Sequence, residues 1–107
     1  MIFLNGLPSI IVDSDDTMDE ILKLYSISKK SFLSYNDISS NHKLQMGVPY
    51  YFVNKRNRGR VQTYIRRKEE SLWEISQIFG IKLKKLKKFN EGNLSNKIIL
   101  RKGIFWD

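Results

Sequence analysis

The chain has 107 residues, no cysteine, and 19 Lys/Arg against 11 Asp/Glu, which gives a formal net charge of +8. The absence of cysteine excludes disulfides, thiolate metal sites and thiol nucleophiles, and no apolar run approaches the length of a membrane span. Residues 1–53 carry a charge of −2 and residues 54–107 carry +10. The basic half favours an anionic partner, but a solvated surface that keeps a small domain soluble explains it equally well.

Two short strands are predicted at the start of the chain. Phe3-Leu4 followed by Asn5-Gly6 is typical of a strand that ends in a tight turn. Ser9–Val12 is rich in β-branched residues and predicts a second strand.

Two helices and a strand follow. Thr17 and Glu20 have the spacing of a capping box, and the apolar residues after them recur at helical intervals. Ser28 is placed to cap a second, shorter helix that ends at Asn36. A polar loop then leads to a strand predicted over residues 48–53.

The second half repeats this plan after a basic segment, residues 54–63, that has no apolar periodicity. Ser71 and Glu74 form another capping box, and Gly80 stands where a helix needs a left-handed residue to end. The predicted elements are a strand at 64–65, helices at 71–79 and 82–89, a strand at 98–100, a turn at Lys102-Gly103 and a last strand at 104–106.

Residues 17–36 and 71–90 are two versions of one sequence, offset by 54 positions without a gap. Eleven of the twenty aligned positions are identical or chemically similar, and they are capping, apolar and turn positions. The residues between and after the helices are kept as well, so the similarity indicates a duplicated architecture. We therefore expect a first unit at 1–53, a basic linker at 54–63 and a second unit at 64–107.

The predicted fold class is α+β, with two small βααβ units in tandem. Each predicted helix has a single apolar stripe, so both helices of a unit must cover the same face of its two-stranded antiparallel sheet. The first unit has an additional strand at its N-terminus. Units of roughly 50 residues have thin cores, so each unit depends on well-formed helix ends and close packing.

At these residues each unit resembles a LysM domain. The residues that carry the resemblance are Glu70-Ser-Leu-Trp, Ile75, Phe79-Gly-Ile and Asn90 in the second unit, and Asp16-Thr-Met, Ile21, Tyr25-Ser-Ile and Asn36 in the first. The match covers about 10–53 and 64–106. Together with the N-terminal Asn-Gly strand and the joint at 50–56, the chain is similar to the C-terminal LysM pair of Bacteroidetes-type glucosaminidase cell-wall hydrolases.

The resemblance implies that each unit binds an N-acetylglucosamine-containing glycan in a shallow groove between two loops. Carried over by position, the groove residues of the first unit are Asp15, Asp16, Thr17, Met18, Ile38, Ser39, Ser40 and Asn41. Those of the second unit are Glu69, Glu70, Ser71, Leu72, Gly92, Asn93, Leu94 and Ser95. Amides at a helix start and carbonyls of a polar loop suit an N-acetyl group, and Met18 or Leu72 offers an apolar floor for its methyl. A bulky residue at Gly92 is expected to block the groove without affecting folding.

The chain departs from the LysM pattern at the groove rim. Asp15 and Glu69 stand where the family has glycine, which adds side chains and negative charge. The family's Pro-Gly turn is replaced by Met46-Gly47 and Lys102-Gly103.

Other functional interpretations are weaker. The aromatic residues recur at helical spacing, which favours core packing over ligand stacking; Trp73 is expected to be half-buried and His42 to be a solvated loop residue. The adjacent carboxylates Asp15/Asp16 and Glu69/Glu70 are better explained by helix capping and the helix dipole than by acid–base catalysis. The basic segments lack the exposed aromatic residues that nucleic-acid binding would use.

The predicted function is a non-catalytic module that recognises N-acetylglucosamine-containing glycan (peptidoglycan) and anchors an attached enzyme or complex to the cell wall. The alternative is a LysM-like protein–protein scaffold in an envelope complex, with degenerate sugar grooves. The expected partners are peptidoglycan or N-acetylglucosamine oligomers and a fused or associated hydrolase or envelope protein. No cofactor, metal site, specific nucleic acid or transmembrane segment is expected.

The expected location is the cell envelope, either periplasmic or associated with the outer membrane. Residues 1–6 are too short and too quickly interrupted for a signal peptide, so the export signal is expected not to be present in this chain.

Overall fold

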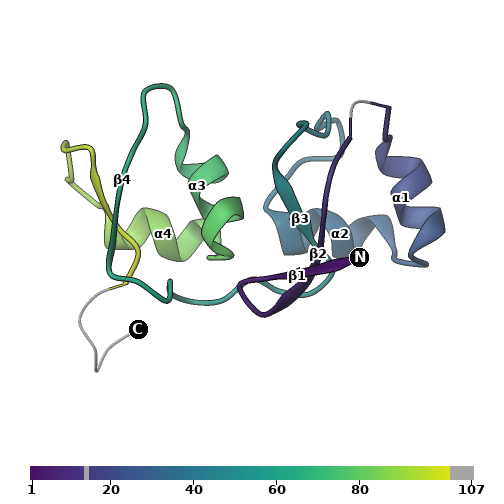
Figure 1. Cartoon of the computed structure of the whole chain (residues 1–107), viewed down its shortest axis with the longest axis horizontal. Helices are drawn as coiled ribbons and strands as arrows, with labels where there is room; N and C mark the ends of the chain where they lie inside the picture. The colour runs from purple at the N-terminus through teal and green to yellow at the C-terminus, as the bar shows by residue number, and fades with distance from the viewer. Residues whose placement is uncertain (14, 102–107) are drawn as a thin grey trace. The chain divides into compact units, whose positions relative to one another are not determined.

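A computed structural model of the chain describes residues 1–13 and 15–101. The chain divides into two compact units, a first unit of Met1–Lys55 and a second unit that begins at Arg56. Both are α+β, and Figure 1 shows that each combines short strands with two helices. The predicted turn at Lys102-Gly103 and the strand at 104–106 lie outside the described residues.

The first unit contains a three-stranded antiparallel sheet with the strand order β1-β2-β3. Its elements are β1 (Ile2–Leu4), β2 (Leu7–Ile11), α1 (Met18–Leu24), α2 (Lys29–Asn36) and β3 (Pro49–Tyr51). Asn5 and Gly6 both have positive φ, at 54° and 73°, as the two-residue turn of a tight hairpin requires. The predicted N-terminal strand and its Asn-Gly turn are therefore confirmed.

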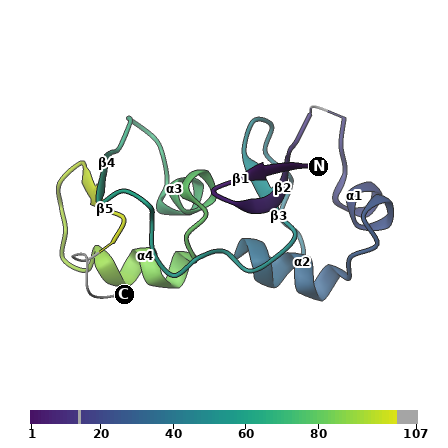
Figure 2. The same cartoon turned by 60° about the horizontal axis from the view of Figure 1, so that its bottom comes forward.

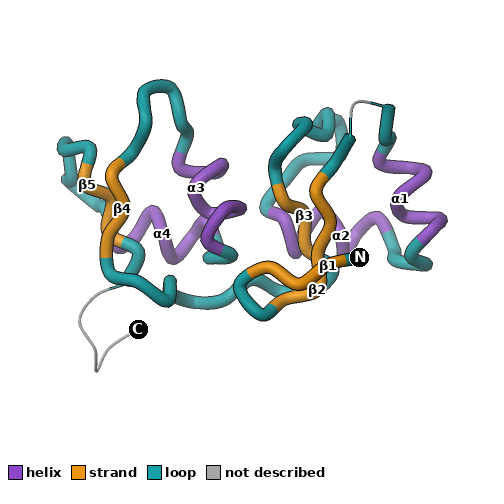
Figure 3. Tube along the Cα trace, viewed as in Figure 1, coloured by secondary structure: helices purple, strands orange, loops and turns teal. Residues whose placement is uncertain are grey.

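The second unit has the same plan without the additional strand. Its elements are β4 (Thr63–Ile65), α3 (Leu72–Phe79), α4 (Leu83–Phe89) and β5 (Lys97–Ile99), and β4 pairs antiparallel with β5. Figures 1 and 2 show both helices on one side of this two-stranded sheet, and Figure 3 shows the same order of helices and strands along the trace. The predicted βααβ arrangement is confirmed.

Helices α1, α2 and α3 begin where the sequence predicts, because side-chain oxygens satisfy their first amides. Ser71 accepts a hydrogen bond from the Glu74 amide at 3.0 Å, and the Glu74 carboxylate accepts one from the Ser71 amide. Thr17 likewise accepts from the Glu20 amide. Here, however, the Glu20 carboxylate accepts from the Thr17 hydroxyl at 2.8 Å, so α1 has the cap but not the full reciprocal box.

Each unit has its own apolar core. In the second unit Ile75, Ile81, Leu86 and Leu100 are fully buried, and Tyr64, Leu72 and Phe79 pack against them. In the first unit the buried residues include Val12, Ile21, Phe32, Tyr50 and Tyr51. The predicted core role of the helix aromatics is confirmed by Phe32 and Phe89, which are buried; Trp73 is half-buried, as expected.

The basic segment at 54–63 is packed rather than free. The Lys55 side chain is buried in the first unit, where its ammonium lies 2.9 Å from the Asp37 carboxylate. Arg56 donates its amide to the Gly80 carbonyl, and Gly59 donates its amide to the Leu100 carbonyl, both at 2.7 Å. A Cβ on Gly59 would lie 2.9 Å from the Leu100 Cβ, so only glycine permits this approach. The two compact units of the structure meet between Lys55 and Arg56. The predicted domain boundaries at residues 53 and 64 stay predictions.

Candidate functional site

The two loops predicted to form the groove leave the same end of the sheet in each unit. In the second unit Ile65 pairs with Lys97, and the Arg66 amide extends the ladder by donating to the Asn96 carbonyl at 2.7 Å. In the first unit Ile11 pairs with Pro49, and the Gly47 amide extends the ladder by donating to the Val12 carbonyl at 3.2 Å. Because the strands are antiparallel, the loop after one strand begins beside the loop that enters the other.

A buried asparagine fixes where the second of these loops begins and ends. The Asn90 side chain donates to the Leu86 and Ile99 carbonyls and accepts from the Ile99 amide, each at 2.8 Å. Asn36 makes the same three types of bond, with Phe32 and Tyr51 as its partners. Asn36 and Asn90 therefore tie the second helix of each unit to a strand.

The first loop is closed by a carboxylate in both units. Asp16 accepts a hydrogen bond from the Asp13 amide at 2.9 Å, and Glu70 accepts one from the Arg67 amide at 2.8 Å. The return bonds, from the amides of Asp16 and Glu70 to the carbonyls of Asp13 and Arg67, are both 3.2 Å long. These two carboxylates thus hold the turn itself, rather than the helix cap that the sequence suggested for them.

Glu70 is the more strongly engaged of the two. It also accepts a hydrogen bond from the Tyr64 hydroxyl at 2.6 Å. Desolvation acts to raise the pKa of Glu70, but the bonds from Tyr64 and the Arg67 amide, with the charges of Arg67 and Arg66, outweigh it and hold the pKa below its ordinary value. The same bond raises the pKa of the Tyr64 hydroxyl. A carboxylate stabilised in its charged form is a poor proton donor.

The remaining first-loop residues divide between structural and exposed roles. The hydroxyls of Thr17 and Ser71 are used in helix caps. Leu72 packs against the core, whereas Met18 is half-buried and more available as an apolar floor. Glu69 is exposed and has a φ of 75°, a conformation that favours the glycine found there in the family pattern.

The second loop of the second unit is braced by its own side chains. Asn93 donates to Asn90 Oδ1 and to the Lys97 carbonyl, while its own Oδ1 accepts from the Ser95 amide and hydroxyl. Ser95 in turn accepts from the Lys97 amide at 3.2 Å. Leu94, between these two residues, is 99% exposed, the most exposed large apolar side chain described. The loop therefore presents one apolar side chain to solvent on a preorganised backbone.

The equivalent loop of the first unit is longer, spanning 37–48 between helix and strand against 90–96 in the second unit. Ile38 is half-buried and Ser39, Ser40 and Asn41 are exposed. The Ser39 hydroxyl donates to Asn41 Oδ1 at 2.7 Å.

His42, in this loop, is not the solvated residue that the sequence predicts. Its Nε2 lies 2.8 Å from the Tyr50 hydroxyl, whose oxygen accepts from the Gln45 amide. Burial lowers the pKa of His42. The solvated-loop prediction is wrong because the loop folds back over the strand residue Tyr50.

Comparison with known protein families identifies two segments of the chain as LysM domains. The matched segments, residues 10–47 and 67–101, together exceed half of the chain and include all sixteen predicted groove residues. The chain belongs to the LysM domain family. The predicted tandem of LysM units is confirmed, while the narrower similarity to Bacteroidetes-type hydrolases stays a prediction.

LysM domains are peptidoglycan- and N-acetylglucosamine-binding modules rather than catalytic domains, and they are associated with the cell wall. Among solved structures, the Bacillus cereus spore cortex-lytic enzyme SleL is similar, with 26% sequence identity and a TM-score of 0.40. The alignment covers 91% of this chain and 21% of SleL, so the LysM pair spans about a fifth of that protein's length. No curated protein matches the chain.

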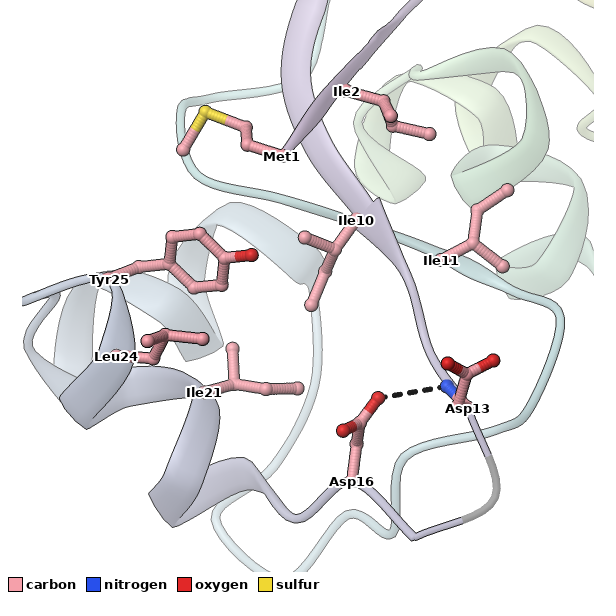
Figure 4. A pocket seen from close by; sticks show the side chains of 9 residues that line it. All are labelled: Met1, Ile2, Ile10, Ile11, Asp13, Asp16, Ile21, Leu24 and Tyr25. Carbon is pink, nitrogen blue, oxygen red and sulfur yellow. Dashed lines mark hydrogen bonds between the residues drawn. The ribbon is translucent and has the colours of Figure 1, made fainter.

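The first LysM unit also has a pocket that the sequence did not predict, lined by both apolar and acidic side chains. It lies between the β1–β2 hairpin and α1, has a volume of about 380 Å³ (Figure 4), and is lined by Met1, Ile2, Ile10, Ile11, Asp13, Asp16, Ile21, Leu24 and Tyr25. Asp16 is its one residue from the predicted groove. Leu24, one of its lining residues, is 73% exposed.

Within residues 1–13 and 15–101, no group of three or more His, Asp or Glu side chains is placed to hold a metal ion. In the same part of the chain, no helix is both long and apolar enough to cross a bilayer.

Proposed function

We propose that this LysM pair binds the N-acetylglucosamine-containing glycan of peptidoglycan through its paired loops and holds an attached or associated enzyme on the cell wall. The observation that carries the proposal is the recurrence, in both units, of two loops that leave the same end of the sheet. The proposed location is the cell envelope, either periplasmic or outer-membrane associated.

The second unit is the stronger candidate for sugar binding. Its loop at 90–96 is held by the Asn90, Asn93 and Ser95 hydrogen bonds before any ligand arrives, so little ordering entropy is lost on binding. Leu94 gives this loop an apolar surface that suits the methyl of an N-acetyl group. The corresponding position of the first unit, Ser40, offers no such surface.

Leu94 also provides a cleaner test than the glycine next to it. Gly92 has a φ of 72°, so any bulky side chain there strains the backbone as well as filling the groove. The sequence-based expectation that such a substitution spares folding is therefore revised. Leu94 is almost fully exposed, so Leu94→Asp should leave the fold intact.

The experiment is titration of the isotopically labelled chain with N-acetylglucosamine oligomers, followed by NMR. We expect shifts in 69–72 and 92–95, and at least a fivefold loss of affinity in Leu94→Asp, about 1 kcal/mol. Val61→Asp, at an apolar residue that is 52% exposed outside both loops, is the matched control and should bind normally. Saturable binding to an envelope protein without loop shifts would instead support the scaffold alternative.

A further inference from the structure

The two LysM units carry opposite charge at the same turn. Asp13 in the first unit and Arg67 in the second occupy equivalent positions, and each donates its amide to the carboxylate that closes the turn. Lys68 follows Arg67 and is exposed. The backbone of this turn therefore forms with either an acidic or a basic residue at this position. The difference in charge between the two units affects which ligands each loop attracts.

The second loop of the second unit is also flanked by cations. Lys87 and Lys88, both exposed, lie in the last turn of α4, and their carbonyls accept from the amides of Asn90 and Glu91 at the start of the loop. Lys97, also exposed, ends the loop, and its carbonyl accepts from Asn93. In the first unit the positions of Lys87 and Lys88 are Leu33 and Ser34, so the fold does not require lysine at either position.

Helix stability does not explain the lysines at the start of α4, whereas Lys87 and Lys88, in its last turn, are favourably placed for the helix dipole. Lys82 stands at the N-cap without a side-chain cap bond, and no acidic residue follows in the first turn, where Lys84 and Lys85 lie instead. Cations are unfavourable at this end of a helix dipole. Within the described part of the chain, none of the lysines at 82, 84, 85, 87 and 88 forms an ion pair.

Arg66, at the junction of the two loops, adds an independent observation. Its amide joins the loops by donating to the Asn96 carbonyl, and its Nε is buried without a hydrogen-bond partner among the described residues. The Arg66 side chain as a whole is half-exposed, so its guanidinium adds positive charge at the junction of the two loops.

We propose that the second unit binds the free carboxylates of the peptide stems attached to the glycan, and so prefers peptide-bearing peptidoglycan over unsubstituted glycan. This inference rests on the proposed function, because it assigns a second contact to the same ligand. Lysine provides a point charge without fixed geometry, which suits carboxylates on flexible stems. Nucleic acid fits less well, because α4 exposes no aromatic residue and neither loop contains one for bases to stack on.

The test compares three ligands: purified peptidoglycan, the same glycan after an amidase has removed the stems and left one lactyl carboxylate on each N-acetylmuramic acid, and uncharged N-acetylglucosamine oligomers. We expect the natural chain to bind peptide-bearing glycan about tenfold more tightly than stripped glycan, the size expected for a few exposed ion pairs. Lys87→Glu/Lys88→Glu should lose most of that preference and keep its affinity for oligomers. Lys29→Glu/Lys30→Glu, on exposed α2 positions of the first unit, is the matched control and should keep the preference.

Equal affinity for peptide-bearing and stripped glycan, or an equal loss in both double variants, would overturn the inference. So would tighter binding to single-stranded nucleic acid than to peptidoglycan at the same salt concentration. Failure of the proposed function has a different signature, since the natural chain would then bind neither stripped glycan nor oligomers. Thermal melts of both double variants, at four exposed positions, establish that they are folded.

Discussion

Ser26 occupies a backbone conformation that serine tolerates poorly, so Ser26→Gly should stabilise the first unit. Its φ is 54°, and the equivalent residue of the second unit, Gly80, has a φ of 66°. The residue after each of them closes the last turn of the first helix with the same type of bond. The Ile27 amide donates to the Leu22 carbonyl at 3.1 Å, and the Ile81 amide donates to the Ser76 carbonyl at 2.9 Å.

The magnitude follows from two opposing terms. A side chain in the left-handed region costs roughly 1–2 kcal/mol relative to glycine. Glycine also raises the conformational entropy of the unfolded chain, which lowers the free energy of unfolding by about 0.4–1 kcal/mol. The Ser26 side chain is exposed and makes no hydrogen bond with any described residue that glycine would lose, so the net gain should be about 0.5–1 kcal/mol.

Urea and thermal unfolding of the natural chain, Ser26→Gly and Ser26→Ala would measure this gain. A unit of this size should melt several degrees higher for each kcal/mol, whereas Ser26→Ala should bring no increase, because alanine keeps the Cβ. The reverse change, Gly80→Ala, should lower stability by about 1 kcal/mol. If Ser26→Gly were no more stable than Ser26→Ala, backbone strain would not be the controlling term.

Asn90 and the half-buried His42 give two further predictions. Asn90→Ala removes a side chain that satisfies the Leu86 carbonyl and the Ile99 amide and carbonyl, so it should cost about 2–4 kcal/mol in a urea titration; a loss below about 1 kcal/mol would show that water replaces these bonds. Burial lowers the pKa of His42 from 6.5, so the folded first unit favours the neutral imidazole. The stability contributed by His42 should thus be complete above about pH 6.5 and lost as the pH falls through the lower folded value. His42→Gln should flatten this pH dependence, and an unchanged profile would exclude His42 as its source.

The helices and the duplication could be predicted because local chemistry determines them. Ser71 caps α3, and Gly80 ends it. Each signal lies within a few residues of the structure that it specifies, so it is readable without knowledge of the tertiary fold.

The loop interiors could not be predicted, because their contacts form only when the unit closes. Lys55 belongs to the basic segment at 54–63, which has no periodic pattern, yet it is buried against Asp37 of the preceding loop. His42 pairs with Tyr50 through a loop that has no periodic pattern. The pocket beside α1 requires β1, which pairs with β2 through a hairpin outside the duplicated sequence. In each case the tertiary fold determines which residues come into contact, and the spacing of residues along the sequence does not reveal it.

The duplication also separates what the fold needs from what it tolerates. Asn36 and Asn90 make the same bonds in both units, and the carboxylates of Asp16 and Glu70 close the same turn, so these residues are structural. Around them the charge reverses, from Asp13 in one turn to Arg67 in the other, with no change in the backbone bonds. At positions where the fold tolerates either charge, two copies of one fold can acquire different ligand preferences. Two linked sites that prefer different parts of one polymer gain affinity through effective concentration, which weak single units could not reach alone.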